Sequence, residues 1–394
     1  MKKILALVLT IIFIFLGCEK TKDENIKIVN PKIENIIGVW INYNEIQNLI
    51  DDCDNQSQLN EKIYSMLNEF AKYNINTIFL HCRAFDDCFY ASEIYQPSIY
   101  CMNENNELKF DILKSFLDCS QDYNIEIHAW VNPYRIRKDN NTGLINQNTL
   151  AGEWYEQNPQ DQRLIITENS IFYNPAYIEV QKYVLSGIRE ILDNYNVEGI
   201  HIDDYFYPTT SEMIDTEIYN KYIKNGGNLS LADFRRQNVN SLVTSIYSLV
   251  KSYDNNFIFS ISPSADIDMD YNTHYADVEL WASQKGYADY LIPQIYFGFE
   301  HETMPFEMVL NEWSNLKTDN TKIAIGLSIY KSGIVDSYAK SGSSEWLDNT
   351  DILKRQISII NNNEKTNGYS YYSCEYLLND FNENLQQEKQ NIIS

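Results

Sequence analysis

The sequence predicts an α/β fold, a single large (β/α)8 barrel of the TIM type with long βα loops. Eight short apolar runs have the length of strands, and a segment able to hold a helix separates each run from the next. The chain has 394 residues, and no Pro-, Gly- or Ser-rich linker divides it after residue 35. A doubly wound sheet is the alternative, but no glycine-rich phosphate loop follows any of the runs.

The predicted strands are distributed along the chain from residue 36 to residue 374. In order they are IIGVWIN (36–42), NTIFLHCR (76–83), IEIHAWVN (125–132), VEGIHIDD (197–204), NFIFSISP (256–263), ADYLIPQIYF (288–297), KIAIGLSIY (322–330) and GYSYYSC (368–374).

Two of the intervening helices have clear signals. One is predicted to begin at Asn174, a good N-cap, with Pro175 in its first turn. Apolar residues then recur at close to helical spacing as far as Ile191. The other is predicted to run from about Leu231 to Tyr253.

The N-terminus indicates export. Two lysines precede an apolar run, residues 4–16, that is too short to span a bilayer comfortably, and Gly17 and Cys18 follow it. Residues 1–18 therefore resemble a lipoprotein signal peptide with Cys18 as the lipidated residue, and the polar residues 19–34 are expected to form a flexible tether. The barrel domain is predicted to span 35–394, lipid-anchored on the periplasmic or extracellular face of the cell envelope. The alternatives are an uncleaved anchor or a soluble exported protein.

Composition narrows the possible partners. The net charge of −24 argues against nucleic acid and against direct binding to an anionic membrane, so membrane contact is expected through the lipid alone. The 30 Tyr and 6 Trp residues suit a sugar-binding cleft. The six cysteines after Cys18 have irregular spacings that define no disulfide pairing, and the scattered His and Cys residues give no reason to expect a metal or a cofactor.

In such a barrel the active site lies at the carboxyl ends of the strands, so the last inward-facing residues are the candidates. In the run 197–204, Ile200 and Ile202 form an apolar face that suits packing against helices. His201 and Asp203 then point into the barrel, with Asp203 at its mouth. Asp204 begins the loop 205–208 and is expected to brace that loop or to orient His201.

The same alternation directs other polar and aromatic side chains at this rim. Burying so many polar groups without a purpose is costly, so their convergence indicates a binding cleft. They are Trp40 and Asn42, His81 and Arg83, His128, Trp130 and Asn132, Ser260 and Ser262, and Gln294 and Tyr296, with Asp86, Asp87, Tyr134, Arg135 and Glu300 in the loops that follow.

These residue types suit sugar chemistry. Glycosidases commonly use two carboxylates, aromatic platforms and planar hydrogen-bonding groups for hydroxyls. The chain contains no GxSxG elbow and no HExxH motif, so the usual signals of serine hydrolases and zinc hydrolases are missing.

Sequence motifs typical of one protein family also occur along the chain, in the order that this family has them. They include HCRAFDDCFYAS (81–92), EIHAWVNPYRI (126–136), NPAYIEVQKYVLSGIREILDNYNVEGIHIDDYFYP (174–208) and YADVELWASQKGYADYLIPQIYFGFE (275–300). With them the chain resembles the glycosyl hydrolase-like 10 family of bacterial envelope proteins. The resemblance implies a secreted protein or lipoprotein with a TIM-type barrel. It also implies hydrolysis of peptidoglycan glycan strands, notably strands already stripped of their stem peptides.

The sequence thus predicts a glycoside hydrolase acting on bacterial cell-wall glycan, with Asp203 as the first catalytic carboxylate. The second is open among Glu300, Asp266 and Glu375, which each follow a predicted strand, and a retaining or inverting course is equally open. Two other functions remain, a non-catalytic carbohydrate-binding lipoprotein and a glycosidase acting on another polysaccharide.

Substrate contacts are predicted from the same motifs. Arg83 and Arg135 are candidates for pairing with the lactyl carboxylates of denuded muramic acid, or else form structural salt bridges. The predicted catalytic residues are Asp203, Asp204 and Glu300, and the predicted substrate-binding residues are Trp40, His81, Arg83, Asp87, His128, Trp130, Asn132, Tyr134, Arg135, His201, Tyr205, Gln294 and Tyr296.

Overall fold

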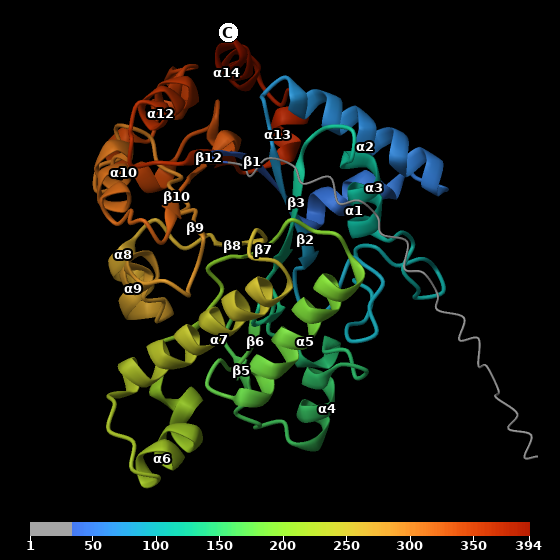
Figure 1. Cartoon of the computed structure of the whole chain (residues 1–394), viewed down its shortest axis with the longest axis vertical. Coiled ribbons are helices and arrows are strands. Elements are labelled where there is room, and N and C mark those ends of the chain that lie inside the picture. The colour runs from blue at the N-terminus through green and yellow to red at the C-terminus, as the bar shows by residue number, and fades with distance from the viewer. Residues whose placement is uncertain (1–33) are drawn as a thin grey trace, which may run out of the picture. The chain divides into compact units, whose positions relative to one another are not determined.

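Parallel strands close into a barrel surrounded by helices in the computed structural model, which describes residues 34–394 (Figure 1). The predicted signal peptide, with Cys18 as its predicted lipidation site, and nearly all of the predicted tether lie outside the described residues. The barrel strands are β1 Ile36–Ile41, β2 Thr77–Arg83, β3 Glu126–Val131, β7 Gly199–Ile202, β8 Ile258–Ile261, β9 Tyr290–Leu291, β10 Lys322–Ile323, β11 Ile325–Leu327 and β12 Gly368–Tyr371.

The nine segments make eight strand positions, because β10 and β11 are separated only by Ala324. The order of neighbours is β10-β9-β8-β7-β3-β2-β1-β12-β11, and every pairing is parallel. Lys322 and Ile323 pair with β9, whereas Ile325 to Leu327 pair with β12, so one stretch of chain joins the two edges. The sheet is closed, and each of the eight predicted strands is present.

Helices connect the strands and cover the barrel from outside (Figure 1). They are α1 Tyr43–Asp51, α2 Gln56–Ala71, α3 Ile112–Ser120, α4 Leu150–Gln157, α5 Ile178–Asn194, α6 Thr216–Lys224, α7 Leu231–Tyr253, α8 Ile267–Met269, α9 Val278–Ser283, α10 Phe306–Asn315, α11 Glu345–Asp348, α12 Ile352–Asn361, α13 Cys374–Leu378 and α14 Glu383–Ile393.

The two predicted helix starts had different outcomes. The helix α7 has the predicted bounds, with Ser230 as its N-cap accepting a hydrogen bond from the Asp233 backbone N–H. The predicted N-cap at Asn174 is wrong, because α5 begins at Ile178. The Asn174 side chain accepts from the Ala176 backbone N–H in a local turn, and its amide donates to two carbonyls of distant loops. These loop contacts hold Asn174 in a turn before the helix.

The connection from β3 to α5 is the longest in the barrel. It contains α4 and a separate antiparallel sheet in the order β4-β6-β5, formed by β4 Arg135–Arg137, β5 Leu164–Ile166 and β6 Ile171–Tyr173. Because this sheet follows the carboxyl end of β3, it places Arg135 beside the mouth of the barrel.

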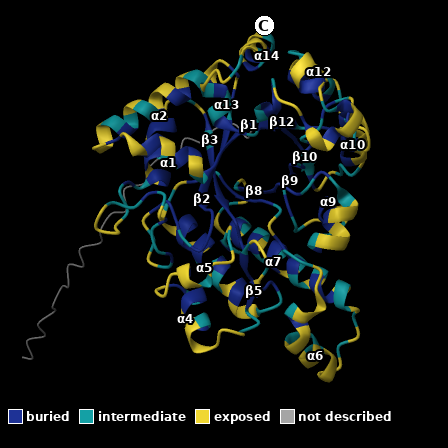
Figure 2. Ribbon diagram, turned by 180° about the vertical axis from the view of Figure 1, so that it is seen from behind, coloured by how far each residue is buried: buried dark blue, intermediate teal, exposed yellow. Residues whose placement is uncertain are grey.

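Buried apolar residues form two clusters. The larger lies between the strands and the helices, and Figure 2 shows the strands dark blue at the centre with exposed residues on the outer faces of the helices. Each fully buried aliphatic side chain, such as Leu242 or Ile246 of α7, contributes roughly 1.5–3 kcal/mol. The smaller cluster fills the barrel interior and comprises Ile36, Trp40, Phe79, Trp130, Ile258, Tyr290, Ile292 and Ala324.

Two further properties concern cysteines and membrane contact. Cys53, Cys82, Cys88, Cys101, Cys119 and Cys374 are all buried free thiols in the described structure. Among residues 34–394, no helix combines the length and the apolar character that crossing a bilayer requires.

Candidate active site

A cavity of about 250 Å³ lies at the carboxyl ends of the barrel strands. Most of its lining residues are at the end of a strand or directly after one, as expected for a barrel of this type. The lining residues are Trp40, Asn42, Tyr43, Asn44, His81, Trp130, Asn132, Arg135, Asp203, Asp204, Tyr205, Ser262, Gln294, Tyr296 and Tyr372.

Asp203 lies in this cavity, as the alternation of β7 predicts. Ile200 and Ile202 pack in the cluster between strands and helices, whereas His201 points into the barrel. The Asp203 side chain is almost fully buried, and its Oδ2 accepts a hydrogen bond of 3.2 Å from Trp130 Nε1. Its Oδ1 is buried without a hydrogen bond of normal geometry among the described residues. This oxygen is therefore left for a group that enters the cavity.

Asp204 lines the same cavity, which strand alternation does not predict, and its role in bracing the loop 205–208 or orienting His201 stays a prediction. The strand β7 ends at Ile202 and the backbone bends at Asp204, so the alternation of side chains no longer holds there. Burial raises the pKa of Asp204, although the positive charge of His274 and a hydrogen bond with the Gln294 side chain act in the opposite direction. Asp204 is half-buried and lies closer to solvent than Asp203.

The two carboxyl groups affect each other. Burial raises the pKa of Asp203 well above its usual range, and the charge of Asp204 raises it further. The charge of Arg135, the Tyr205 backbone N–H and the Trp130 indole partly offset this increase. Two neighbouring carboxyls with raised pKa values share a strong tendency to hold a proton, and this is the state that a general acid needs at neutral pH.

His201 supports the floor of the cavity from inside the barrel. Its Nε2 accepts a 3.0 Å hydrogen bond from Trp40 Nε1, and its Nδ1 lies 2.8 Å from Ser260 Oγ. Since an indole N–H can only donate, His201 carries its proton on Nδ1 and donates it to Ser260. Burial, with the two nearby histidines, lowers the pKa of His201 well below its usual range. His201 is thus a neutral, fully buried ring that fixes Trp40.

His81 and Trp130 form a stacked pair in the cavity wall, with ring centroids 3.7 Å apart and planes 7° apart. Burial, together with the charge of Arg135, lowers the pKa of His81 well below its usual range. The stack is therefore uncharged, and it holds the Trp130 indole that donates to Asp203.

Arg135 is the only cationic side chain lining the cavity in the described structure. Its guanidinium stacks on the rings of Tyr205, at 4.3 Å, and Phe85, at 5.0 Å. Within residues 34–394 it forms no salt bridge, and its Nε has no hydrogen-bond partner. Two aromatic faces thus orient this guanidinium while its charge remains available to a ligand.

Arg83 does not line the cavity, and of its two predicted roles the structure shows the structural salt bridge. The pairing of β2 with β3 shifts between His81 and Arg83, so Cys82 is an extra residue and the alternation is lost. Arg83 is fully buried in an ion pair with Asp86, and it also donates to the Asn132 carbonyl. Its guanidinium lies 4.7 Å from the centre of the Tyr95 ring.

Four other predicted contacts also lie away from the cavity lining, and one of them is His201, which lies beneath it. Asp87 is enclosed in the same loop, where burial raises its pKa to about 6. Tyr134 is fully buried in the cluster between strands and helices. His128 lies near the amino-terminal end of β3, with Nε2 3.2 Å from Glu126 Oε2. It faces inward but sits too deep in the barrel to reach the mouth.

The candidates for a second carboxylate do not line the cavity. Glu300 is exposed, and its backbone N–H donates to Glu345. Asp266 is the N-cap of α8. At the start of α13, the Glu375 backbone N–H donates a hydrogen bond to the Glu45 side chain. Glu300 thus lies outside the cavity lining and its catalytic role stays a prediction, whereas Asp203 and Asp204 are the only carboxylates lining the cavity in the described residues.

Several lining residues were missed by sequence reasoning. Tyr372 follows β12 in the inward-facing register, and Tyr43 follows directly on Asn42, so strand alternation and strand-end position could have identified both. Tyr296 and Tyr372 stack with centroids 5.6 Å apart and form one aromatic wall.

His274 affects the site from further along the chain. It lies in a π-helical turn, Asp270–His274, with its Nδ1 3.1 Å from Asp270 Oδ1. Burial alone would lower its pKa, but the hydrogen bond and charge of Asp270, with Asp204 adding, raise the pKa of His274 above its usual value. No sequence signal pairs these residues with Asp204, because they lie well past the end of β8.

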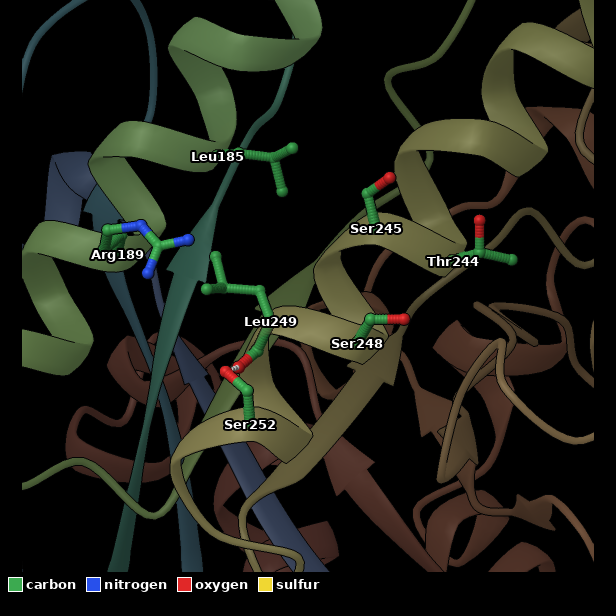
Figure 3. Close-up of a pocket in the computed structure, with 7 residues that line it drawn as sticks. All are labelled: Leu185, Arg189, Thr244, Ser245, Ser248, Leu249 and Ser252. Atoms are coloured by element: carbon green, nitrogen blue, oxygen red, sulfur yellow. Dashed lines mark hydrogen bonds between the residues drawn. The ribbon is translucent and has the colours of Figure 1, made fainter.

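A second hollow lies on the helical layer between α5 and α7, with a volume of about 440 Å³ (Figure 3). Its side chains are short hydroxyl groups and leucines with a single charged residue, Arg189, and they stand on the outer helices away from the strand ends. It has no carboxylate or aromatic ring among its lining residues, so it offers no acid–base chemistry.

Comparisons with known proteins identify the family. The chain matches the family described as glycosyl hydrolase-like 10 over residues 35–344. It is 28% identical over 334 residues to the glycosyl hydrolase DigH of Escherichia coli strain K12, which covers 79% of this chain and 74% of DigH. It is also 28% identical over 344 residues to the glycosyl hydrolase YngK of Bacillus subtilis strain 168. That alignment covers 82% of this chain and 64% of YngK.

Solved structures confirm the fold. The glycoside hydrolase domain of PgaB (BpsB) from Bordetella bronchiseptica aligns with a TM-score of 0.57 at 10% identity, over 92% of this chain and 99% of that domain. The catalytic domain of β-amylase from Paenibacillus polymyxa aligns with a TM-score of 0.55 at 8% identity, over 92% of this chain and 98% of that domain. At such low identity the likeness concerns architecture alone.

Proposed function

Because this chain belongs to the glycosyl hydrolase-like 10 family, we propose that it cleaves glycosidic bonds in bacterial cell-wall glycan, acting on peptidoglycan strands without stem peptides. Membership of the family indicates a glycoside hydrolase, and the glycan is the proposed part. The observation that carries the proposal is the pair Asp203 and Asp204, whose raised pKa values suit proton transfer inside an aromatic cavity at the barrel mouth.

The shape and lining of the cavity suit a sugar chain. Trp40, Trp130, Tyr296 and Tyr372 present aromatic surface, and the Asn132 and Gln294 amides line the same cavity as planar hydrogen-bonding groups. A volume of about 250 Å³ is small for a ligand site, so a single sugar unit would fill it while the rest of the strand continues along the rim.

The free charge of Arg135 favours a glycan substrate without stem peptides. In such a strand each muramic acid unit keeps a free lactyl carboxylate, whereas in an intact strand the peptide occupies that group. A planar guanidinium oriented by two rings and without an ion pair in the described structure suits bidentate binding of a carboxylate. The substrate would thus supply the anion that Arg135 lacks.

We also propose export and lipid anchoring at Cys18, which the apolar run and the Gly17–Cys18 pair support. Mass spectrometry of the mature protein is the test. We expect an N-terminus at Cys18 carrying lipid, and an unmodified Cys18 thiol would contradict the anchor without affecting the barrel.

Product analysis tests the proposed reaction. Purified protein is incubated with denuded glycan, with intact sacculi and with a panel of neutral polysaccharides, and new reducing ends are counted. We expect cleavage of denuded glycan in preference to the other two. Cleavage of a neutral polysaccharide instead would indicate a different glycosidase, and binding without turnover of any substrate would indicate a carbohydrate-binding protein.

A further inference from the structure

The cavity contains two carboxylates that are neighbours in sequence and no third among the described residues. Glycosidases with two carboxylates place them on the two sides of the bond to be cleaved. One protonates the leaving oxygen, and the other, on the opposite face of the sugar, attacks C1 or activates water. Asp203 and Asp204 both project from the end of β7, so no carboxylate of the described chain faces them across the cavity.

A nucleophile on the opposite face of C1 must therefore come from the substrate. A sugar with an acetamido group on C2 carries one, because its amide oxygen can reach C1 and close a five-membered ring. Resting on the glycan hydrolysis proposed above, we propose that this enzyme cleaves β-linked 2-acetamido sugars by participation of the acetamido group, with Asp203 holding that group and Asp204 protonating the leaving oxygen. The β linkage is required because the amide oxygen must approach C1 from the face opposite the leaving group.

The positions of the two residues support this division of roles. Asp203 is the deeper of the two, held by the Trp130 indole, and its free Oδ1 is suited to accept the amide N–H. Asp204 is nearer to solvent, where a departing sugar and an entering water can reach it. The aromatic walls formed by Trp40 and Tyr372 beside Asp203 offer an apolar surface for the acetamido methyl group.

The reaction starts with Asp203 ionised and one proton on Asp204, and it proceeds in two balanced steps. In the first, the C1–O bond breaks with its electron pair on the leaving oxygen, which takes the proton of Asp204. The amide oxygen forms a bond to C1 while Asp203 takes the amide proton, which gives an oxazoline. In the second, water gives a proton to Asp204 and bonds to C1. The bond between C1 and the amide oxygen breaks, and Asp203 returns the proton to nitrogen, so one water is consumed and the configuration at C1 is retained.

The N-acyl group provides the first test. Denuded glycan is compared with the same glycan after removal of its N-acetyl groups and after chemical re-acetylation. We expect deacetylation to lower the rate by roughly 10³-fold or more, the scale of a lost intramolecular nucleophile, and re-acetylation to restore it. Equal rates on acetylated and deacetylated glycan would overturn this inference while leaving the glycosidase intact. No cleavage of either acetylated sample would instead reject the proposed function.

Binding of a stable mimic gives a readout independent of turnover. The thiazoline analogue of the N-acetylglucosamine oxazoline is titrated by calorimetry into the wild type and the variants Asp203→Asn, Asp204→Asn and Glu300→Gln. We expect Asp203→Asn to weaken binding at least tenfold, and Asp204→Asn and Glu300→Gln to bind within a few-fold of the wild type. Unchanged binding by Asp203→Asn, or a glycosyl adduct on either aspartate detected by mass spectrometry, would overturn the inference.

Discussion

Two acidic pairs follow strands of the same barrel, Asp86–Asp87 after β2 and Asp203–Asp204 after β7, and the structure treats them differently. Asp86 forms a salt bridge of 3.3 Å with Arg83 and accepts hydrogen bonds from the hydroxyls of Tyr173 and Tyr183. The protein therefore satisfies both its charge and its oxygens. Asp203 receives the Trp130 indole N–H and is also stabilised by the Tyr205 backbone N–H, but its buried Oδ1 has no hydrogen bond of normal geometry within the described residues. A carboxylate completed by the protein, such as Asp86, stabilises the fold, whereas Asp203, left incomplete at a cavity, is available to a substrate.

The effect of removing one charge from each pair should separate the two roles, and the largest effect is expected at Asp203. Asp203→Asn keeps the shape but cannot exchange a proton, so the rate on denuded glycan should fall by about 10³-fold or more. Reducing ends released per hour by equal amounts of folded protein measure this. Glu300→Gln, which removes an exposed carboxylate after a neighbouring strand, is the matched control and should retain wild-type activity.

The stability of the same variant has a predictable sign. Because burial raises the pKa of Asp203 above its value in the unfolded chain, the ionised carboxylate costs stability at neutral pH. This cost disappears as the pH falls toward the unfolded value of about 4. We therefore expect Asp203→Asn to have an equal or higher Tm than the wild type at pH 7, with the difference vanishing near pH 4. A lower Tm at pH 7 would show that the carboxylate is structural.

Asp86→Asn should show the reverse pattern. It leaves the fully buried Arg83 without its counter-charge, which costs about 3–5 kcal/mol of unfolding free energy when one partner of a buried pair is removed. Denaturant unfolding measures this loss. The activity of the remaining folded molecules should stay near that of the wild type, and a selective loss of activity at unchanged stability would end the distinction between the two pairs.

A smaller effect is expected from Arg135→Gln. Losing a bidentate contact with a lactyl carboxylate should lower kcat/KM on denuded glycan about 10- to 100-fold, equivalent to roughly 1.5–3 kcal/mol. Arg137→Gln is the matched control, since Arg137 lies on the same short strand and pairs with Asp139 instead. Equal losses of kcat/KM in Arg135→Gln and Arg137→Gln would contradict a specific contact. So would a loss in Arg135→Gln that is equally large on glycan whose lactyl carboxylates are esterified.

The smallest effect concerns His274. Asp204 faces Asp203, Arg135, the Gln294 amide and the charge of His274, and the last of these lowers the pKa of Asp204. His274→Gln should therefore raise the pKa of Asp204, and the alkaline limb of the pH profile of kcat/KM should move to higher pH if Asp204 donates the proton. His301→Gln serves as a control remote from the cavity lining. If the alkaline limb moved to lower pH instead, a group other than Asp204 would be the proton donor.

Much of the fold could be predicted from sequence because its signals are local. Strand runs such as VEGIHIDD contain their own alternation, and α7 is delimited by Ser230 and by the end of its apolar pattern. The start of α5 could not be placed, since Asn174 is held by carbonyls from loops far along the chain. A local capping preference was outweighed there by tertiary hydrogen bonds.

The site was predictable where the strand alternation persists and failed where it stops. Trp40, Trp130 and Asp203 reach the cavity as alternation requires. Arg83 turns away because a bulge inserts Cys82, and a bulge has no reliable signal in one sequence. Asp204 turns inward because the backbone bends after β7, and neither a bend nor a distant partner such as His274 can be read from spacing.

One assay directly tests whether Asp203 and Asp204 are the catalytic pair of the proposed cell-wall glycoside hydrolase. Denuded glycan is incubated with equal amounts of folded wild type, Asp203→Asn, Asp204→Asn and Glu300→Gln, and released reducing ends are counted. We expect the wild type and Glu300→Gln to cleave the glycan, and the rate to fall about 10³-fold in Asp203→Asn and in Asp204→Asn. Near-full activity in either aspartate variant, or loss of activity in Glu300→Gln, would contradict the assignment of this pair.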